Sequence, residues 1–468
     1  MGLCFWPYGG CTVSTRSFQQ IIDMIKPNIF RFLIFIVILV PASFGYGQRD
    51  LARMRQINPQ MPAPMEIDEE RVAANGIRRI EGKNLVLYTD LREQADIVEL
   101  AEVFDKAVPL WCEYFSIDIA DTEGWQVNAF VIGDKKKFIA AKLFPEDLPE
   151  FPTGFNLHHN MWIYHQPGNY YTRHLLLHEG THSIMHWFLR GVGPPWYSEG
   201  MAELLAVHRW HEGELEMNYD LKSKEEAEYW GRVKIIREDV AAGDSRSLED
   251  VFVTPFKAFS SAHSVRNYAW AWAACKFFGE HPLSRAQFAE LESRAHDETN
   301  EFNRVFFRAV KNDWPQLKRD WKLFLADMDY GIRVSQLAIT DVAGEGGNLF
   351  SIDATRGWQK TSIEVKKGET YQINASGRFQ VANDDGTPWP CEPGGVTIEY
   401  FRGHPLGMLM AGVAGGEAEE TDGLTAPTPI GLKGTFTATQ DGKLCFRINE
   451  SAAKLADNSG SVQVRVSQ

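Results

Sequence analysis

The chain has 468 residues, of which 44% are hydrophobic and 24% are charged, and its formal net charge at pH 7 is −14. This length suits two or three domains, and this composition excludes wholesale disorder and a multi-span membrane protein. The acidic balance argues against nucleic-acid binding, so no nucleic-acid partner is expected.

The N-terminus has the layout of an export signal. Phe30–Val40 is a short apolar run with Lys26 and Arg31 at its start, and small residues follow it. We therefore expect a signal peptide over residues 1–47, with Met24 as an alternative start. An uncleaved N-terminal anchor is the other interpretation, although the apolar run is short for a membrane span. The protein is expected to be exported, periplasmic or extracellular, or membrane-anchored if the leader is retained.

The segment after the leader changes from polar to mixed in character. Residues 48–68 carry prolines and predict a linker or an extended lead-in. Residues 69–333 begin with strands at Leu85–Thr89 and Val127–Ile132 and a helix between them. A further strand or hairpin is predicted at Phe155–His165. Helices are predicted after about residue 170, over the ranges Tyr171–Leu189, Ser198–Trp210, Lys222–Val240 and Arg266–Gly279 and in two more that end near Tyr330.

Residues 334–468 have a different pattern, in which short alternating segments are separated by glycines. This pattern predicts an all-β domain. Its clearest strands are Thr361–Val365, Tyr371–Ala375, Thr435–Ala438 and Ser461–Val466. The predicted fold is therefore an α+β domain, with a mixed sheet followed by a helical subdomain, plus a C-terminal all-β sandwich.

Four of the six cysteines follow the predicted leader, at positions 112, 275, 391 and 445. Disulfide bonds persist in the oxidising compartments that exported proteins reach. Cys391 and Cys445 lie in the same C-terminal segment and are the first pair to consider for a disulfide. Four buried free thiols are the alternative.

The pentapeptide HEGTH occupies residues 178–182 within a predicted helix. A spacing of four puts His178 and His182 on one helix face, a turn apart, where both imidazoles can reach one cation. Glu179 flanks that face, and its carboxylate can accept a proton from a water that attacks a carbonyl. Glu179 is therefore the predicted general base.

A carboxylate further along the chain completes a ligand set. Glu199 follows His182 by seventeen positions in PPWYSEGMAE, where Ser198 is expected to cap a new helix. Two imidazoles and one carboxylate, with a fourth position left open, are typical of catalytic zinc. Glu203 lies one turn further on and is expected to orient a liganding histidine through its other ring nitrogen. A Glu199 more than about 6 Å from both imidazoles would contradict this interpretation.

The motifs HEGTH and WYSEGMAE together resemble the gluzincin branch of zinc metallopeptidases, which includes thermolysin and the zinc aminopeptidases. The resemblance covers roughly residues 80–330. It implies that His178, His182 and Glu199 bind zinc, that Glu179 is the general base, and that the substrate is a peptide or protein. No GAMEN-like exopeptidase signature is found, so endopeptidase and exopeptidase action both stay open.

Members of this family also use a tyrosine or histidine from a later helix to stabilise the oxyanion. Tyr268 and His263 are the candidates here, and core packing is the alternative for Tyr268. His174 and His186 continue the four-residue ladder of the motif, and structural roles are predicted for both. Other residues that could edge or wall a substrate pocket, or else serve in packing, are His158, His159, His165, Trp162, Trp187 and Trp196.

Two segments of the C-terminal domain, at residues 357–377 and 446–466, resemble the calcium-dependent galactophilic lectin fold. The resemblance implies carbohydrate as a partner and calcium at Asp457 and Asn458, whose oxygens suit that ion. Glu450 stands where the family has aspartate, which is a departure from the calcium ligand set. A sandwich that only packs against or tethers the enzyme is the alternative.

The leading hypothesis is an exported, zinc-dependent peptidase. The alternative is a surface glycan- or polymer-binding protein whose α/β domain is a zinc-bound but non-hydrolytic scaffold. The general base, both histidines and the downstream acid are all present, which favours hydrolysis. A purely structural zinc fits poorly, because such sites usually fill all four positions with cysteine and histidine.

Overall fold

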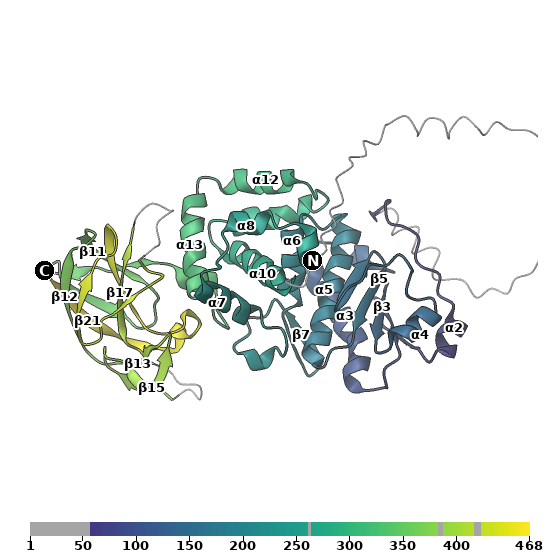
Figure 1. Ribbon diagram of the computed structural model, residues 1–468, viewed down its shortest axis with the longest axis horizontal. Coiled ribbons are helices and arrows are strands. Elements are labelled where there is room, and N and C mark those ends of the chain that lie inside the picture. Colours follow the sequence, from purple (N-terminus) through teal and green to yellow (C-terminus); the bar gives the residue numbers. More distant parts are fainter. Residues whose placement is uncertain (1–56, 261–263, 382–386, 416–422) are drawn as a thin grey trace, which may run out of the picture. The chain divides into compact units, whose positions relative to one another are not determined.

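The computed structural model describes residues 57–260, 264–381, 387–415 and 423–468. The predicted signal peptide and His263 lie outside the described residues. The described chain is mixed α/β, with a helical part and several β-sheets, as Figure 1 shows. None of the helices in these ranges is long and apolar enough to cross a membrane.

The first sheet has five strands in the order β1-β2-β3-β5-β4. Its three central strands are parallel, and their apolar side chains are buried, as expected of strands that are covered on both faces. The predictions at residues 85–89 and 127–132 are confirmed. The strands are β1 (Arg78–Glu81), β2 (Leu85–Thr89), β3 (Val127–Ile132), β4 (Gly154–Leu157) and β5 (Asn160–Tyr164).

The segment predicted as a strand or hairpin is a hairpin. β4 and β5 pair antiparallel around a turn at His158 and His159, and His158 takes a left-handed conformation with φ of 56°. β4 is at the end of the strand order, so it forms one edge of this sheet. This edge strand contacts the helix that carries HEGTH.

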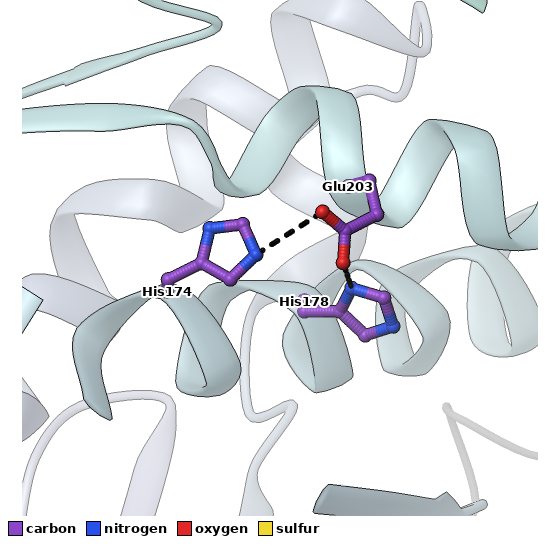
Figure 2. A group of neighbouring side chains, drawn as sticks. All are labelled: His174, His178 and Glu203. Atoms are coloured by element: carbon purple, nitrogen blue, oxygen red, sulfur yellow. Dashed lines mark ion pairs between the residues drawn. The ribbon is translucent and has the colours of Figure 1, made fainter. Parts of the chain in front are cut away.

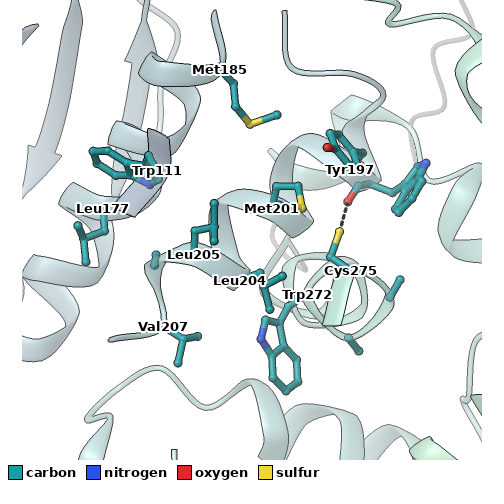
Figure 3. Close-up of a cluster of buried hydrophobic side chains, with 14 of the residues drawn as sticks. Trp111, Leu177, Met185, Tyr197, Met201, Leu204, Leu205, Val207, Trp272 and Cys275 are labelled. Carbon is teal, nitrogen blue, oxygen red and sulfur yellow. Dashed lines mark hydrogen bonds between the residues drawn. The ribbon is translucent and has the colours of Figure 1, made fainter. Parts of the chain in front are cut away.

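Three packed helices form the centre of the helical part: α5 (Asn169–Ile184), α6 (Pro195–Ala206) and α10 (Ser264–Glu280). α6 contacts both of the others, and α5 also contacts α3 (Ala95–Tyr114). Figure 3 shows the apolar side chains that fill the space between them, including Met201 and Leu205 of α6. Full burial of each such side chain contributes about 1.5–3 kcal/mol.

Glycine allows the closest of these contacts. A Cβ at Gly200 of α6 would lie 2.4 Å from Cys275 Sγ and 2.6 Å from the carbonyl oxygen of Ala271, both in α10. The two helices can approach this closely only because Gly200 has no side chain.

Three predicted helix boundaries are wrong. α6 begins at Pro195, which suits a first helical position because it lacks an N–H group, so Ser198 lies inside the helix and does not cap it. α6 also ends before Trp210, because residues 208–211 form a hairpin strand with residues 214–217. The helix predicted from Lys222 begins only at Arg232, after Gly231 in a left-handed conformation.

The remaining helices are shorter or lie further from α5. They are α2 (Glu69–Ala74), α4 (Lys135–Ala140), α7 (Arg232–Ala242), α8 (Leu248–Phe252), α9 (Phe256–Phe259), α11 (Arg285–Ala289), α12 (Asn300–Val310) and α13 (Trp314–Ala326). The described part of the predicted linker is packed: Met61 joins the main core, and Asn58 Nδ2 donates to the carbonyl oxygen of His186 at 2.7 Å. It is therefore an extended lead-in held against the helices.

The C-terminal part contains two larger sheets, and apolar residues from both share one core cluster. One sheet has the order β14-β13-β21-β10-β9, with β12 pairing β19 and β21, and the other has the order β18-β17-β20-β11-β8. Each of the four predicted segments coincides with a strand, except that Ala438 lies one residue beyond the end of β19. The strands are β8 (Thr340–Asp341), β9 (Gly344–Glu345), β10 (Leu349–Asp353), β11 (Gln359–Val365), β12 (Thr370–Ser376), β13 (Phe379–Val381), β14 (Trp389–Cys391), β17 (Leu409–Ala414), β18 (Thr428–Pro429), β19 (Lys433–Thr437), β20 (Gly442–Ile448) and β21 (Ser459–Ser467). The C-terminal part also contains a hairpin of β15 (Val396–Phe401) and β16 (His404–Leu406). A separate hairpin of β6 (His208–His211) and β7 (Glu214–Met217) follows α6.

Candidate metal centre

The packing of α5 against α6 brings His178, His182 and Glu199 together. Glu199 Oε2 lies 3.3 Å from His178 Nε2 and 3.5 Å from His182 Nε2. These distances are well inside the 6 Å limit stated above. One ligand atom from each residue falls within 4.8 Å of the other two, so a single ion can be shared by all three.

Two of the residues between the histidines, Gly180 and Thr181, contact side chains of α3. Thr181 Oγ1 accepts a hydrogen bond from Trp111 Nε1 at 3.0 Å. A Cβ at Gly180 would lie 2.6 Å from the Trp111 ring and 2.8 Å from that of Phe104. The glycine and threonine of HEGTH therefore fix α5 against α3, while the histidines face α6.

The other ring nitrogens of the two histidines face polar groups. His178 Nδ1 lies 3.4 Å from Glu203 Oε1, and His182 Nδ1 lies 3.3 Å from Ser198 Oγ. A carboxylate facing Nδ1 favours the tautomer that carries its proton there, which leaves the Nε2 lone pair free for a metal. The donor set is two imidazole nitrogens and a carboxylate oxygen, and it fits zinc with a position left open.

A second trio of possible ligands shares His178 with the first. It consists of His174, His178 and Glu203, drawn in Figure 2. The side chains of His174 and Glu203 are 0% and 3% exposed, and Arg232 pairs with both oxygens of Glu203 at 2.9 Å. The guanidinium opposes a second cation at this position. In the first trio the side chains are 7–11% exposed, so solvent can reach it. The first trio is the better catalytic candidate.

Glu179 lies beside the edge strand β4. Its backbone carbonyl accepts a hydrogen bond from Asn156 Nδ2 at 3.1 Å, and its carboxylate sits over Gly154. Burial raises the pKa of Glu179, and the imidazoles of His178 and His182 act in the opposite direction. A carboxylate with a raised pKa is a stronger base than an exposed one, as a general base at neutral pH requires.

The proposed ligands are coupled electrostatically. Burial alone would raise the pKa of Glu199, but the imidazoles of His182 and His178 lower it to about 2. Burial lowers the pKa of His178, but the carboxylates of Glu199 and Glu203 outweigh burial and hold it well above its ordinary value. A site that favours positive charge to this extent is suited to a cation.

Tyr268, on α10, lies next to this group. Its ring contacts that of His178 edge-on, with centroids 5.8 Å apart, and it also contacts Phe259. Burial, followed by the negative charges of Glu199 and Glu179, raises the pKa of Tyr268. The phenol therefore stays protonated at neutral pH and can donate a hydrogen bond.

The remaining histidines of the region have packing roles where the structure defines them. His174 Nδ1 lies 3.0 Å from the carbonyl oxygen of Ala206, and His159 Nε2 lies 2.9 Å from that of Pro62. Burial lowers the pKa of His186 to about 4. His165 is exposed, and His158 is half-buried in the β4–β5 turn. The three tryptophans considered as pocket walls, Trp162, Trp187 and Trp196, all belong to buried core clusters.

Of the three residues considered for calcium binding, Asn458 and Glu450 are in contact. Asn458 Nδ2 donates to Glu450 Oε2 at 2.6 Å, and both residues are buried, whereas Asp457 is exposed. Burial raises the pKa of Glu450 to about 7, the hydrogen bond from Asn458 opposes this, and the charge of Asp457 adds to it.

The proposed disulfide is absent from the described chain. Cys391 and Cys445 form no disulfide and are both buried, like Cys112 and Cys275. Cys391 packs in the core shared by the two C-terminal sheets, whereas Cys445 belongs to a separate small cluster around Trp358. The alternative of four buried thiols describes the structure.

Three residues of the site were not found from the sequence. Arg232 lies far from HEGTH in the chain, the sequence predicts only a capping role for Ser198, and Gly154 belongs to a hairpin strand with no motif. The only local signal was the position of Ser198 beside Glu199. The other two require knowledge of which segments pack together.

No family model matches the chain, and no curated protein matches it. Among solved structures, the chain is similar to one described as "EclA N-terminal domain; PllA-like lectin". The match covers 25% of this chain and 93% of that chain, with 20% sequence identity and a TM-score of 0.20. A TM-score this low carries no argument about function, so both family resemblances stay predictions.

Proposed function

We propose that the protein is an exported zinc-dependent peptidase with its active site at His178, His182, Glu199 and Glu179. The observation that carries the proposal is the convergence of two Nε2 atoms and one carboxylate oxygen within 4.8 Å of one another, beside a buried glutamate. The leader pattern supports export. Calcium and carbohydrate binding by the C-terminal part stay predictions.

Each residue has a role that follows from its surroundings. Zinc, when bound, supplies a Lewis acid that polarises the scissile carbonyl and favours ionisation of water. Glu179 takes the proton of the attacking water and then delivers it to the leaving amine. Tyr268 donates a hydrogen bond to the oxygen on which negative charge develops. Gly154 leaves the space that the Glu179 carboxylate occupies.

The test is peptide cleavage together with zinc content. The purified protein, its Glu179→Gln variant and a Glu280→Gln control are incubated with a diverse peptide pool, with and without a chelator. Glu280 is a suitable control because it pairs with Lys276 at 2.6 Å, at the far end of α10. We expect all three proteins to contain zinc. The wild type and Glu280→Gln should show chelator-sensitive cleavage, whereas the cleavage rate of Glu179→Gln should be lower by about 10²–10⁴-fold or more.

Three results would contradict this proposal. Cleavage that survives in Glu179→Gln removes Glu179 from the role of base. A wild-type protein without zinc refutes the metal centre. A wild-type protein that binds zinc but cleaves no member of the pool favours the alternative of a non-hydrolytic, surface-binding scaffold.

A further inference from the structure

A buried arginine lies behind the candidate metal centre. Arg232, the first residue of α7, is 4% exposed at its side chain. Its Nε and Nη2 donate to the two oxygens of Glu203, each at 2.9 Å, and its Nη1 donates to the carbonyl oxygen of Trp230 at 3.0 Å. A bidentate pair of this kind fixes the plane of a carboxylate as well as its position.

The other neighbours of Glu203 make looser contacts. His178 Nδ1 and His174 Nε2 each lie 3.4 Å from a Glu203 oxygen, which is longer than a well-formed hydrogen bond. The Nδ1 of His174 faces the carbonyl oxygen of Ala206, which only accepts, so the ring proton of a neutral His174 is on Nδ1. Its Nε2 then has no proton to give to Glu203. Arg232 is therefore the group that holds Glu203 in place.

We propose that Arg232 is a positioning residue for the metal centre: through Glu203 it holds His178 in the tautomer and ring orientation that present Nε2 to a metal ion. The inference rests on the proposed function, because it takes His178 as a zinc ligand. Glu203 lies between the two residues, with Oε1 facing His178 Nδ1 and both oxygens bound by Arg232. A carboxylate that could rotate would no longer select the Nδ1–H tautomer.

Charge gives a second reason for the arginine. A carboxylate that is 3% exposed would be strongly destabilising without a charged partner. Arg232 supplies that partner from α7, whereas Glu203 comes from α6 and His178 from α5. The orientation of one ligand thus depends on three helices.

The experiment measures metal binding rather than catalysis. Zinc affinity is determined by competition with a chromogenic chelator, and the visible spectrum of the cobalt-substituted protein reports the ligand geometry. The variant is Arg232→Lys, which keeps the charge but offers a point donor in place of a fork. We expect zinc affinity to fall about 10–100-fold and the cobalt spectrum to change.

Asp239→Asn is the matched control for general loosening. Asp239 is on the same helix, is 2% exposed, and pairs with Arg266 at 2.6 Å and with Trp270 Nε1 at 2.8 Å. Both of these partners are on α10 and neither is Glu203, so its replacement should lower stability and leave zinc affinity unchanged. A Glu203→Gln variant should weaken zinc binding, and adding Arg232→Lys to it should weaken binding no further, because both act through one contact.

The outcomes separate the two claims. Equal zinc affinity and an equal cobalt spectrum in wild type and Arg232→Lys overturn the positioning role and leave the metal centre intact. An equal loss in Arg232→Lys and Asp239→Asn also overturns it, because the effect would then be general destabilisation. A wild-type protein that binds no zinc refutes the proposed function itself.

Discussion

Replacing Gly154 by alanine tests how closely the edge strand approaches the proposed general base. An alanine Cβ at this position would lie 2.5 Å from Glu179 Oε1, 3.2 Å from Cδ and 3.3 Å from Cγ. Cβ atoms essentially never show contacts under 3.0 Å. The backbone of Gly154 is not in the left-handed region, so alanine introduces no strain of its own.

The contact falls on the end of a flexible side chain, so the carboxylate will move while the strand stays in place. Restoring an ordinary contact of 3.4 Å from 2.5 Å requires a displacement of about 0.9 Å. A misplacement of about 1 Å costs on the order of 10²-fold in rate, or about 2.7 kcal/mol of activation free energy. Stability should be unchanged or rise by about 0.4–1 kcal/mol, because alanine restricts the unfolded chain.

The assay compares kcat and KM on a peptide substrate, with denaturant unfolding and zinc affinity measured on the same samples. We expect kcat to fall about 10²-fold while folding and zinc binding persist. Gly279→Ala is the matched control, since its Cβ would meet only Phe288 at an ordinary 3.6 Å. In a Glu179→Gln background, Gly154→Ala should have no further effect. A Gly154→Ala protein with wild-type kcat would refute the reasoning.

Three further outcomes follow from the structure. Gly200→Ala should destabilise the protein by about 1–3 kcal/mol in denaturant unfolding, because its Cβ would lie 2.6 Å from backbone in α10; unchanged stability would mean that the helices separate easily. Tyr268→Phe should lower kcat about 10²-fold with little change in KM, whereas an unchanged kcat would leave only the packing role. Because the pKa of Glu450 is raised to about 7 from 4.5 in the folded state, the folded state holds the proton more tightly. The contribution of Glu450 to stability should be greatest below about pH 4.5 and should fall by on the order of 3 kcal/mol between pH 4.5 and 7. Glu450→Gln should remove this pH dependence, and a variant with the same dependence would contradict the assignment.

Elements with a strong local pattern were predictable from the sequence. The buried strands at residues 85–89 and 127–132 have the predicted bounds, because each is a short, mostly apolar run bounded by polar residues or glycine. The wrong boundaries occur where tertiary contacts or turns override helical spacing. Residues 208–211 pair with a neighbouring strand, and Gly231 interrupts the spacing that predicts a helix from Lys222.

Some residues of the candidate site were likewise predictable from local sequence, and others depend on tertiary packing. His178 and His182 are related by helical geometry alone, so their proximity is predictable from spacing. Glu199 required a motif, because it lies on another helix. Arg232 has no signal in the sequence, since its contact with Glu203 depends on where α7 packs, and the disulfide proposed from shared location was wrong because its two cysteines belong to different clusters.

Under the proposed function, the position of β4 at the edge of its sheet has a consequence for which peptides can be cut. A strand at a rim recognises a partner through main-chain N–H and C=O groups, and such a partner must be extended to pair with it. A target segment held in a helix, or interrupted by proline, cannot make this ladder. Substrate selection at this edge strand would therefore depend on the conformation of the target segment before its sequence. Unfolded chains would be cleaved and compact ones would not.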